Sequence, residues 1–358
     1  MNKTLVLLVF ALALYSCKKE KKEITDIPAS TSKVNFSLSA MPYQKLSRYN
    51  MFEGELKNME PVEDVMVYEP ASMLFTDYAH KKRFIWMPYN VKAKYKDDGE
   101  ILDMPIGTIL VKHFYYDLVQ PNNDRKIIET RVMIHKMTGW EFAEYVWNDE
   151  QTEAYLDMDG SYKSLSWIDD NGNPRSTNYR IPSETECFIC HKTNGKPIPI
   201  GVKPQNLNHN HDYGSGQVNQ LDHMIQMGYL ESKPSSIVST IDYNDPSYSI
   251  DLRFRSYVDI NCAHCHREGA HCDYRPLRLA FNETSDPQNL GLCVEPDEIL
   301  DPAMNFIIAP SNISRSLMHF RLSATDENVR MPLLGRTLVH DEGVAILEQW
   351  INSKTDCN

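Results

Sequence analysis

The pattern of hydrophobic and polar positions changes in a clear order along the chain. Residues 5–14 are an unbroken apolar run, and residues 18–33 are polar. From about 35 to 180 apolar and polar positions tend to alternate, whereas from about 181 onward apolar residues recur at intervals of three and four. Alternation is typical of strands and the longer interval of helices. We therefore expect an α+β fold, with an N-terminal antiparallel β-rich domain followed by a mostly α-helical region.

Segments within 35–180 have the composition of strands. Residues 106–116 are rich in β-branched and aromatic side chains, and residues 126–137 alternate, with Ile128 and Val132 on one side. Turns rich in Asp, Asn and Gly separate the later segments. Short strands at this spacing predict an antiparallel sandwich or barrel. No motif in this region points to catalysis.

Helices are predicted at three places in the second half of the chain. Residues 218–230 and 252–261 place their apolar side chains at helical intervals. Residues 341–353 do the same, and their acidic first residues suit the N-terminus of a helix.

The first 17 residues have the pattern of a secretory leader. Their apolar run is shorter than the ~20 residues that span a bilayer. It ends in Leu-Tyr-Ser-Cys at 14–17, which resembles the lipobox of bacterial lipoproteins, where the Cys is lipidated and becomes the mature N-terminus. We expect residues 1–17 to be a lipoprotein signal peptide with Cys17 as the lipid anchor, and residues 18–34 to be a flexible tether. Cleavage at a nearby small residue is the alternative.

Charge and destination limit the partners. Such a chain would be anchored in the bacterial cell envelope, at the periplasmic side or the outer membrane surface, which is an oxidising compartment. The formal net charge of −12 argues against nucleic acid, which attracts clustered Lys and Arg. An anionic surface predicts a protein partner with a basic patch. A composition of 42% hydrophobic and 24% charged residues is ordinary for a globular protein and excludes a disordered polymer or a multi-span membrane protein.

The eight Cys residues include two Cys-x-x-Cys-His strings, which are Cys187–Cys190–His191 and Cys262–Cys265–His266. This string is the attachment signature of c-type haem. Two thiols add to the two haem vinyl groups and form thioethers, and one helical turn presents both sulfurs to the same macrocycle edge. The His that follows supplies the proximal nitrogen to the iron. The sequence thus predicts two covalently attached haem c groups.

Two roles without haem fit the strings less well. A structural zinc site has ligand pairs about 15–20 residues apart, whereas Cys190 and Cys262 are 72 residues apart. A thioredoxin-like redox pair requires a neighbouring βαβ unit, and the pattern of apolar positions indicates none.

The surroundings of the second string resemble a class I cytochrome c domain. A helix precedes Cys262, a loop at 329–336 contains Met331, and a helix closes the chain. The resemblance implies His266 and Met331 as the axial ligands of the iron, and a Met/His pair raises the haem potential. Met304 and Met318 are competitors for Met331. The carbonyl of Pro276 is a candidate partner for the second ring nitrogen of His266.

The sixth ligand of the first haem is left open by the sequence. Met227, just before Gly228, is preferred. The other candidates are Met224, His209, His211 and His223. A His ligand would lower the potential, and an open position would allow catalysis.

Three further Cys residues lie in the second half of the chain. Cys272 and Cys293 enclose a short loop, and we expect a disulfide between them. Closing that loop would contribute ~3 kcal/mol in the chain-entropy model. Cys357 would be left free, or would replace either partner.

Taken together, the chain resembles a bacterial dihaem c-type cytochrome family. The strings that carry the resemblance are residues 147–154, 256–266 and 330–336. It implies a first haem-binding segment at 181–250, a class I cytochrome c-like domain at 251–358, and electron transfer between redox partners. It implies no substrate, so whether the protein is also an enzyme stays open. The alternatives are a dihaem oxidoreductase of peroxidase type with an open first site, and a non-redox surface-binding lipoprotein.

Overall fold

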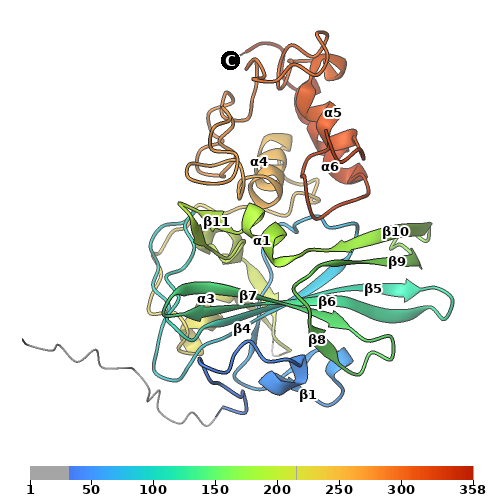
Figure 1. The fold of residues 1–358 in the computed structure, drawn as a ribbon. Helices are drawn as coiled ribbons and strands as arrows, with labels where there is room; N and C mark the ends of the chain where they lie inside the picture. The colour runs from blue at the N-terminus through green and yellow to red at the C-terminus, as the bar shows by residue number, and fades with distance from the viewer. Residues whose placement is uncertain (1–31, 215, 358) are drawn as a thin grey trace, which may run out of the picture. The chain divides into compact units, whose positions relative to one another are not determined.

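An eight-stranded antiparallel sheet is the largest element of the computed structural model (Figure 1). The structure describes residues 32–214 and 216–357, so the expected leader, Cys17 and most of the tether lie outside the described residues. Within these ranges, no helix has the length and apolar character needed to cross a membrane. The strands of the sheet are β3 (Met66–Val67), β4 (His80–Trp86), β5 (Ile109–Val119), β6 (Asp124–Lys136), β7 (Gly139–Trp147), β8 (Ala154–Leu156), β9 (Ser161–Ile168) and β10 (Pro174–Ile181).

The long central strands set the order of the sheet. The order is β10-β9-β5-β6-β7-β8, and β4 pairs with both β5 and β3. Shorter antiparallel ladders lie outside the sheet, and their strands are β1 (Phe52–Glu53) with β2 (Glu60–Pro61), β11 (Lys192–Thr193) with β12 (Lys196–Pro197), and β13 (Asn210–Asp212) with β14 (Gln217–Asn219).

Both faces of the sheet are covered. Successive side chains of a strand point to opposite faces. In β5, Ile109 and Val111 therefore enter an apolar cluster with residues from the segment 34–65. Leu110 points the other way and packs in a second cluster with Leu221. Because chain covers the sheet on both sides, the central strands are buried almost continuously and are less clearly alternating than a half-exposed strand would be.

Helices are short and few in the described part of the chain. The α-helices are α1 (Glu184–Cys190), α2 (Pro204–Leu207), α3 (Gln220–Gln226), α4 (Ile250–Asn261), α5 (Leu317–Ser323) and α6 (Asp341–Asn352). The 3-10 helices are η1 (Leu46–Tyr49), η2 (Leu56–Asn58) and η3 (Ile313–Arg315). The last two predicted helices are thus present as α4 and α6, and the predicted helix at 218–230 is reduced to α3.

The expected fold class is wrong, because the region after 181 is not mostly helical. Helix accounts for 18% of the structure, which makes the chain mainly β-sheet. Residues 262–312 contain turns and isolated bridges instead of helices. Their backbone groups are paired within local turns and by some long-range bonds, for example from the Leu279 amide to the His266 carbonyl at 3.0 Å. Hydrogen bonds of this kind satisfy the backbone without any regular period in the sequence.

The C-terminal helices are joined to the sheet through the loop that precedes β4. Phe254 of α4 and Trp350 of α6 pack with ring centroids 4.8 Å apart. The Phe75 amide donates to Asn261 Oδ1 at 2.8 Å, and the Phe75 ring stacks on His340 at 4.1 Å. In Figure 1, α1 lies between the sheet and α4. The two Cys-x-x-Cys-His strings are therefore both placed at this junction, because one lies on α1 and the other begins where α4 ends.

Candidate functional site

The first string is presented by the short helix α1. The Ser183 amide donates to Glu186 Oε2 at 2.7 Å, which closes the start of the helix with a capping interaction. The helix brings Cys187 and Cys190 to the same side, and it ends at His191, whose amide donates to the Cys187 carbonyl at 2.9 Å. This is the one-turn arrangement that the sequence predicts for two sulfurs on one edge.

His191 is held in the orientation of a metal-binding imidazole. Its Nδ1 lies 3.0 Å from the carbonyl of Ile198 and donates to it. Such a bond fixes the tautomer and leaves Nε2 as the free donor atom. Burial lowers the pKa of His191 to about 4, so the ring is neutral at pH 7. Its Nε2 lone pair is therefore available to a metal ion.

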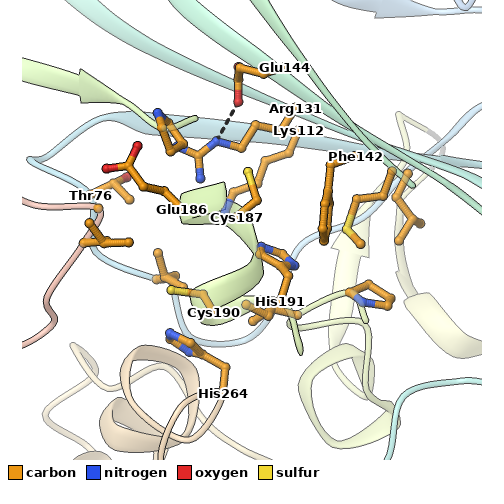
Figure 2. A pocket seen from close by; sticks show the side chains of 18 of the residues that line it. Thr76, Lys112, Arg131, Phe142, Glu144, Glu186, Cys187, Cys190, His191 and His264 are labelled. Atoms are coloured by element: carbon orange, nitrogen blue, oxygen red, sulfur yellow. Dashed lines mark ion pairs between the residues drawn. The ribbon is translucent and has the colours of Figure 1, made fainter. Parts of the chain in front are cut away.

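The first cavity lies between α1 and the sheet. Cys187, Cys190 and His191 line it from α1, and Phe142 contacts His191 with ring centroids 5.4 Å apart. Figure 2 shows these side chains, together with His264 from the second string, around one space. Apolar walls of this kind suit a flat macrocycle.

The sheet contributes a row of charged side chains to the same cavity. The strand register places Arg83, Lys112, Arg131 and Glu144 side by side across β4 to β7, so all four point to one face. Arg131 Nε lies 3.3 Å from Glu144 Oε2 (Figure 2). Lys112 Nζ lies over the Phe114 ring at 4.6 Å. Burial raises the pKa of Glu144 and lowers the pKa of Lys112, because the charged form of each is poorly solvated. This side of the cavity can accept anionic groups such as carboxylates.

The second string repeats the local geometry of the first. Cys262 caps α4, and its amide donates to the Val258 carbonyl at 2.9 Å. The His266 amide donates to the Cys262 carbonyl at 3.0 Å, which matches the bond between His191 and Cys187. Burial lowers the pKa of His266 to about 4. Both strings therefore present two sulfurs and a neutral imidazole in the same way.

A second cavity brings the predicted axial pair together. Cys262, His266 and Met331 line one space, although 65 residues separate His266 from Met331 in the sequence. Met318 lines the same cavity, whereas Met304 does not. Aliphatic side chains form much of the wall, and Arg275 and Arg321 add positive charge. These residues offer a soft thioether and an imidazole nitrogen in an apolar space, which is the donor set of a Met/His haem iron.

The segment that contains Met331 is held by Arg336. This guanidinium is 3% exposed. It donates to the carbonyl of Met331 at 2.7 and 3.0 Å, and to the carbonyls of Leu338, Arg321 and Leu322 at 3.0 to 3.1 Å. A planar fork can satisfy several carbonyls at once. Arg336 thus fixes the backbone from which the Met331 side chain projects.

Asp77 ties the same segment to the sheet region. Its carboxylate accepts from the amides of Thr337 and Leu338 at 2.6 and 2.8 Å. It also accepts from the hydroxyls of Thr337 and Thr177, the latter on β10, at 2.8 and 3.2 Å. The second cavity is therefore braced by the β-rich part of the chain.

One predicted contact of the second string is wrong. Nδ1 of His266 is buried and has no hydrogen-bond partner in the described part of the chain, so the carbonyl of Pro276 does not accept from it. The carbonyl of His266 itself is engaged with Leu279. The ring of His266 is therefore not held by a hydrogen bond at Nδ1, whereas the ring of His191 is held by its bond to the Ile198 carbonyl.

None of the residues considered as sixth ligand of the first haem lines the first cavity. Met227 and Met224 pack in the same apolar cluster as Cys187 and Phe188. The three His candidates also have other contacts. His209 Nε2 lies 2.8 Å from the Glu69 carbonyl, and His211 lies 3.7 Å from Glu69 Oε2. The rings of His223 and Tyr213 stack with centroids 3.7 Å apart. Among the described residues, the methionine that lines the cavity is Met133 of β6. The Met227 ligand remains a prediction.

The expected disulfide is wrong. Cys293 is bonded to Cys357, with sulfurs 2.00 Å apart, and Cys272 is a buried free thiol. The amide of Cys272 donates to the Cys265 carbonyl at 3.0 Å, which keeps this residue beside the second string. Cys293 lies instead where the C-terminal end of the chain returns after α6. The pairing follows from these backbone paths and not from the length of the loop.

The two strings also touch each other. Sγ of Cys190, a ring nitrogen of His264 and Sγ of Cys265 all lie within 4.8 Å of one another. As free thiols, Cys190 and Cys265 share a hydrogen bond that lowers the pKa of Cys190 and raises the pKa of Cys265. Thioether formation would remove both protons. The three atoms could otherwise hold a metal ion, which would need a fourth ligand for a tetrahedral zinc site.

Sequence reasoning missed the polar residues that support both cavities. In the sequence, Arg131 and Glu144 occupy positions typical of the solvent face of a strand. In the structure they pair with each other beneath α1 and are largely buried there. A signal was present, because Glu129, Arg131 and Met133 form the second side of the alternating segment 126–137. Arg336 lies in the segment 330–336, but nothing local distinguishes a clamping arginine from an exposed one.

Comparison with known proteins identifies no relative of the chain. The site is therefore defined by its own chemistry: Cys187, Cys190 and His191 line the first cavity, and Cys262, His266 and Met331 line the second. No protein-family model matches the chain, and searches of curated proteins and of solved structures found no match.

Proposed function

We propose that the protein is a dihaem c-type cytochrome that passes electrons between redox partners. The observation that carries the proposal is the meeting of Cys262, His266 and Met331 around one cavity. These residues come from the start and the end of a long irregular segment, so a shared role explains why the chain brings them together. A haem bound there supplies one-electron chemistry at an iron whose potential depends on its two axial donors.

The residues present fit a haem at both strings. At the first string, Ile198 orients His191 so that its Nε2 faces outward, and Cys187 and Cys190 lie on one side of α1. The charged row offers Lys112 and Arg131 to the carboxylate groups that a haem carries. At the second string, Arg275 and Arg321 line the cavity together with their partners Asp297 and Glu298, so a haem carboxylate there would compete with these acids. Both His side chains are half-buried, and burial lowers the pKa of each to about 4, so both rings are neutral at pH 7.

We also propose, from the leader alone, that Cys17 anchors the chain to the bacterial cell envelope. The acidic sequence supports a redox partner with a basic patch. Association with such a partner should weaken as ionic strength rises, because salt screens charges beyond about 10 Å at 0.1 M. Binding that is independent of salt would contradict this part of the proposal.

The experiment is a haem count on the full chain expressed in a bacterial host with the cytochrome c maturation machinery. Pyridine haemochrome analysis should give two haems per chain. The double variant Cys187→Ala/Cys190→Ala should retain one haem, and so should Cys262→Ala/Cys265→Ala. Cys272→Ala is the matched control, because this thiol is buried beside the second string and has no place in the proposed attachment. It should retain both haems.

Other outcomes of the same experiment distinguish the alternatives. Zinc bound at one per chain with no haem would assign Cys190, His264 and Cys265 to a metal centre. Two haems with a high-spin spectrum and turnover of peroxide would favour the peroxidase-type oxidoreductase, with the first site open. Fewer than two haems in the parent chain contradicts the proposed function.

A further inference from the structure

The two attachment strings contact each other at equivalent positions. Each position of the first string has its counterpart 75 residues later, so Cys190 corresponds to Cys265 and Ile189 corresponds to His264. Cys190 Sγ lies within 4.8 Å of both Cys265 Sγ and a ring nitrogen of His264. In return, Cys265 Sγ lies 3.7 Å from the carbonyl of Ile189. A twofold axis makes contacts reciprocal in this way, with position i of one element against j of the other and j against i, so the pattern is the one expected of local twofold symmetry.

A third contact follows the same rule. The Asn194 amide donates to the Gly269 carbonyl at 2.8 Å, and each of these residues is three positions after the His of its own string. The approach is close, because a Cβ at Gly269 would lie 2.2 Å from Asn194 Oδ1. The contact therefore extends beyond the cysteines and fixes the two segments against each other.

The first cavity also reaches the second string. His264, which comes directly before Cys265 in the sequence, lines the first cavity together with Cys190 and His191 (Figure 2). The second Cys of each string is at the centre of the contact, whereas Cys187 and Cys262 face their own cavities. Whatever is attached to Cys190 is thus adjacent to whatever is attached to Cys265.

We propose that the two strings form one paired unit with local twofold symmetry, which joins the two haem sites edge to edge at Cys190 and Cys265. This inference rests on the proposed function. With haem bound at both strings, this adjacency would allow a one-electron exchange between the sites, in which one iron would lose the electron that the other gains. No bond is made or broken and no proton moves in this exchange. The sites then act as one coupled relay and not as two independent carriers.

The test uses glycines of the contact and a matched control. Gly269→Ala introduces the Cβ that collides with Asn194, and Gly195→Ala introduces one that meets nothing within 4 Å. Both glycines have a left-handed backbone, with φ of +71° and +75°, so the conformational cost of Ala is similar at the two positions. The double variant Asn194→Gly/Gly269→Ala removes the obstructing side chain and retains the Asn194 backbone donor.

The readout is circular dichroism in the Soret region, measured on fully loaded full-length protein. Two haems in contact couple their transitions and give a signal with a positive and a negative lobe. We expect this couplet in the parent and in Gly195→Ala, a smaller amplitude in Gly269→Ala, because the Asn194 side chain must swing aside, and recovery in the double variant. A redox titration supplies a second measurement, since the potential of the second site should shift when Cys187→Ala/Cys190→Ala removes the first haem.

The inference and the proposed function fail in different ways. A parent chain without two haems overturns the proposed function. A parent with two haems, no couplet and an unshifted second potential overturns the paired unit only. Equal loss in Gly195→Ala and Gly269→Ala also overturns it, because the effect would then come from backbone strain. If Gly269→Ala does not fold, the parent couplet and the titration of the one-haem variant still decide the question.

Discussion

Replacing Arg336 by Met should loosen the segment that presents Met331. The buried guanidinium donates to four carbonyls; that of Arg321 also accepts from the Met331 amide, so the carbonyls of Met331, Leu338 and Leu322 are the ones that depend on it. A methionine fills most of the space of the arginine stem but has no donor. All three carbonyls would then lose the hydrogen bond that the side chain gives them, while the apolar packing is largely retained.

The magnitude follows from the number of groups left without a partner. A buried polar group that loses its only partner costs ~1–3 kcal/mol, so three carbonyls give about 3–9 kcal/mol before relaxation. Water entering beside the half-buried Met331 and Leu338 recovers part of this. We expect Arg336→Met to lower the free energy of unfolding by about 4 kcal/mol. Arg336→Lys should recover less than half of the loss, because one ammonium cannot reach carbonyls that a planar fork spans.

The assay is urea unfolding of the loaded protein, followed by tryptophan fluorescence and by the charge-transfer band that methionine ligation gives a ferric haem. The band should disappear at lower urea in Arg336→Met than the fluorescence transition does, because the segment opens before the core. Arg315→Met is the control, since Arg315 is exposed and its side chain donates only to Asn305. It should change stability by less than about 0.5 kcal/mol. An Arg336→Met protein within about 1 kcal/mol of the parent would refute the reasoning.

Three further predictions concern the ligand, the charged row and the disulfide. Met331→Leu should abolish the methionine charge-transfer band in the absorption spectrum, and Met318→Leu should leave it; the reverse result would make Met318 the ligand. Burial lowers the pKa of Lys112 in the haem-free folded chain, so the unfolded chain binds more protons between that lowered value and about 10.4, and the stability of the haem-free parent rises with pH through this window. In urea unfolding measured from pH 7 to 10, the stability of Lys112→Met should rise less with pH than that of the parent. An equal rise of stability with pH would show that Lys112 is solvated. Cys357→Ser should lower stability by about 4 kcal/mol in the chain-entropy model, because the bond to Cys293 closes a separation of 64 residues. Non-reducing peptide mapping that finds Cys293 joined to another cysteine would contradict the pairing.

Part of the fold can be predicted because it depends on local pattern. The sequence predicts the C-terminal helix at 341–353, and the helix is α6, Asp341–Asn352, because its apolar face packs on α4 and its first turn is acidic. The long strands β5 and β6 overlap the predicted strand segments 106–116 and 126–137, each extending two or three residues beyond one end. The irregular segment 262–312 cannot be predicted, since its backbone is satisfied partly by non-repeating local turns and partly by partners far away in sequence. Periodicity does not encode such partners, and the expectation of a mostly helical region is wrong for this reason.

The candidate site divides in the same way. The cysteines and histidines of the two strings are predictable because their chemistry requires fixed spacing within one turn. The meeting of Met331 with His266 is expected only by resemblance to class I cytochromes c. The charged row at Lys112 and Arg131 depends on strand register, which one sequence does not reveal. The contact between Cys190 and Cys265 depends on how α1 and the end of α4 dock, and no local signal announces it.

The central claim is that both strings carry covalent haem. Its most direct test is mass spectrometry of tryptic peptides from the denatured, matured protein. The account predicts that the peptide containing Cys187 and Cys190 and the peptide containing Cys262 and Cys265 each carry the mass of one haem. Unmodified thiols at these positions, or a disulfide joining Cys190 to Cys265, would contradict it.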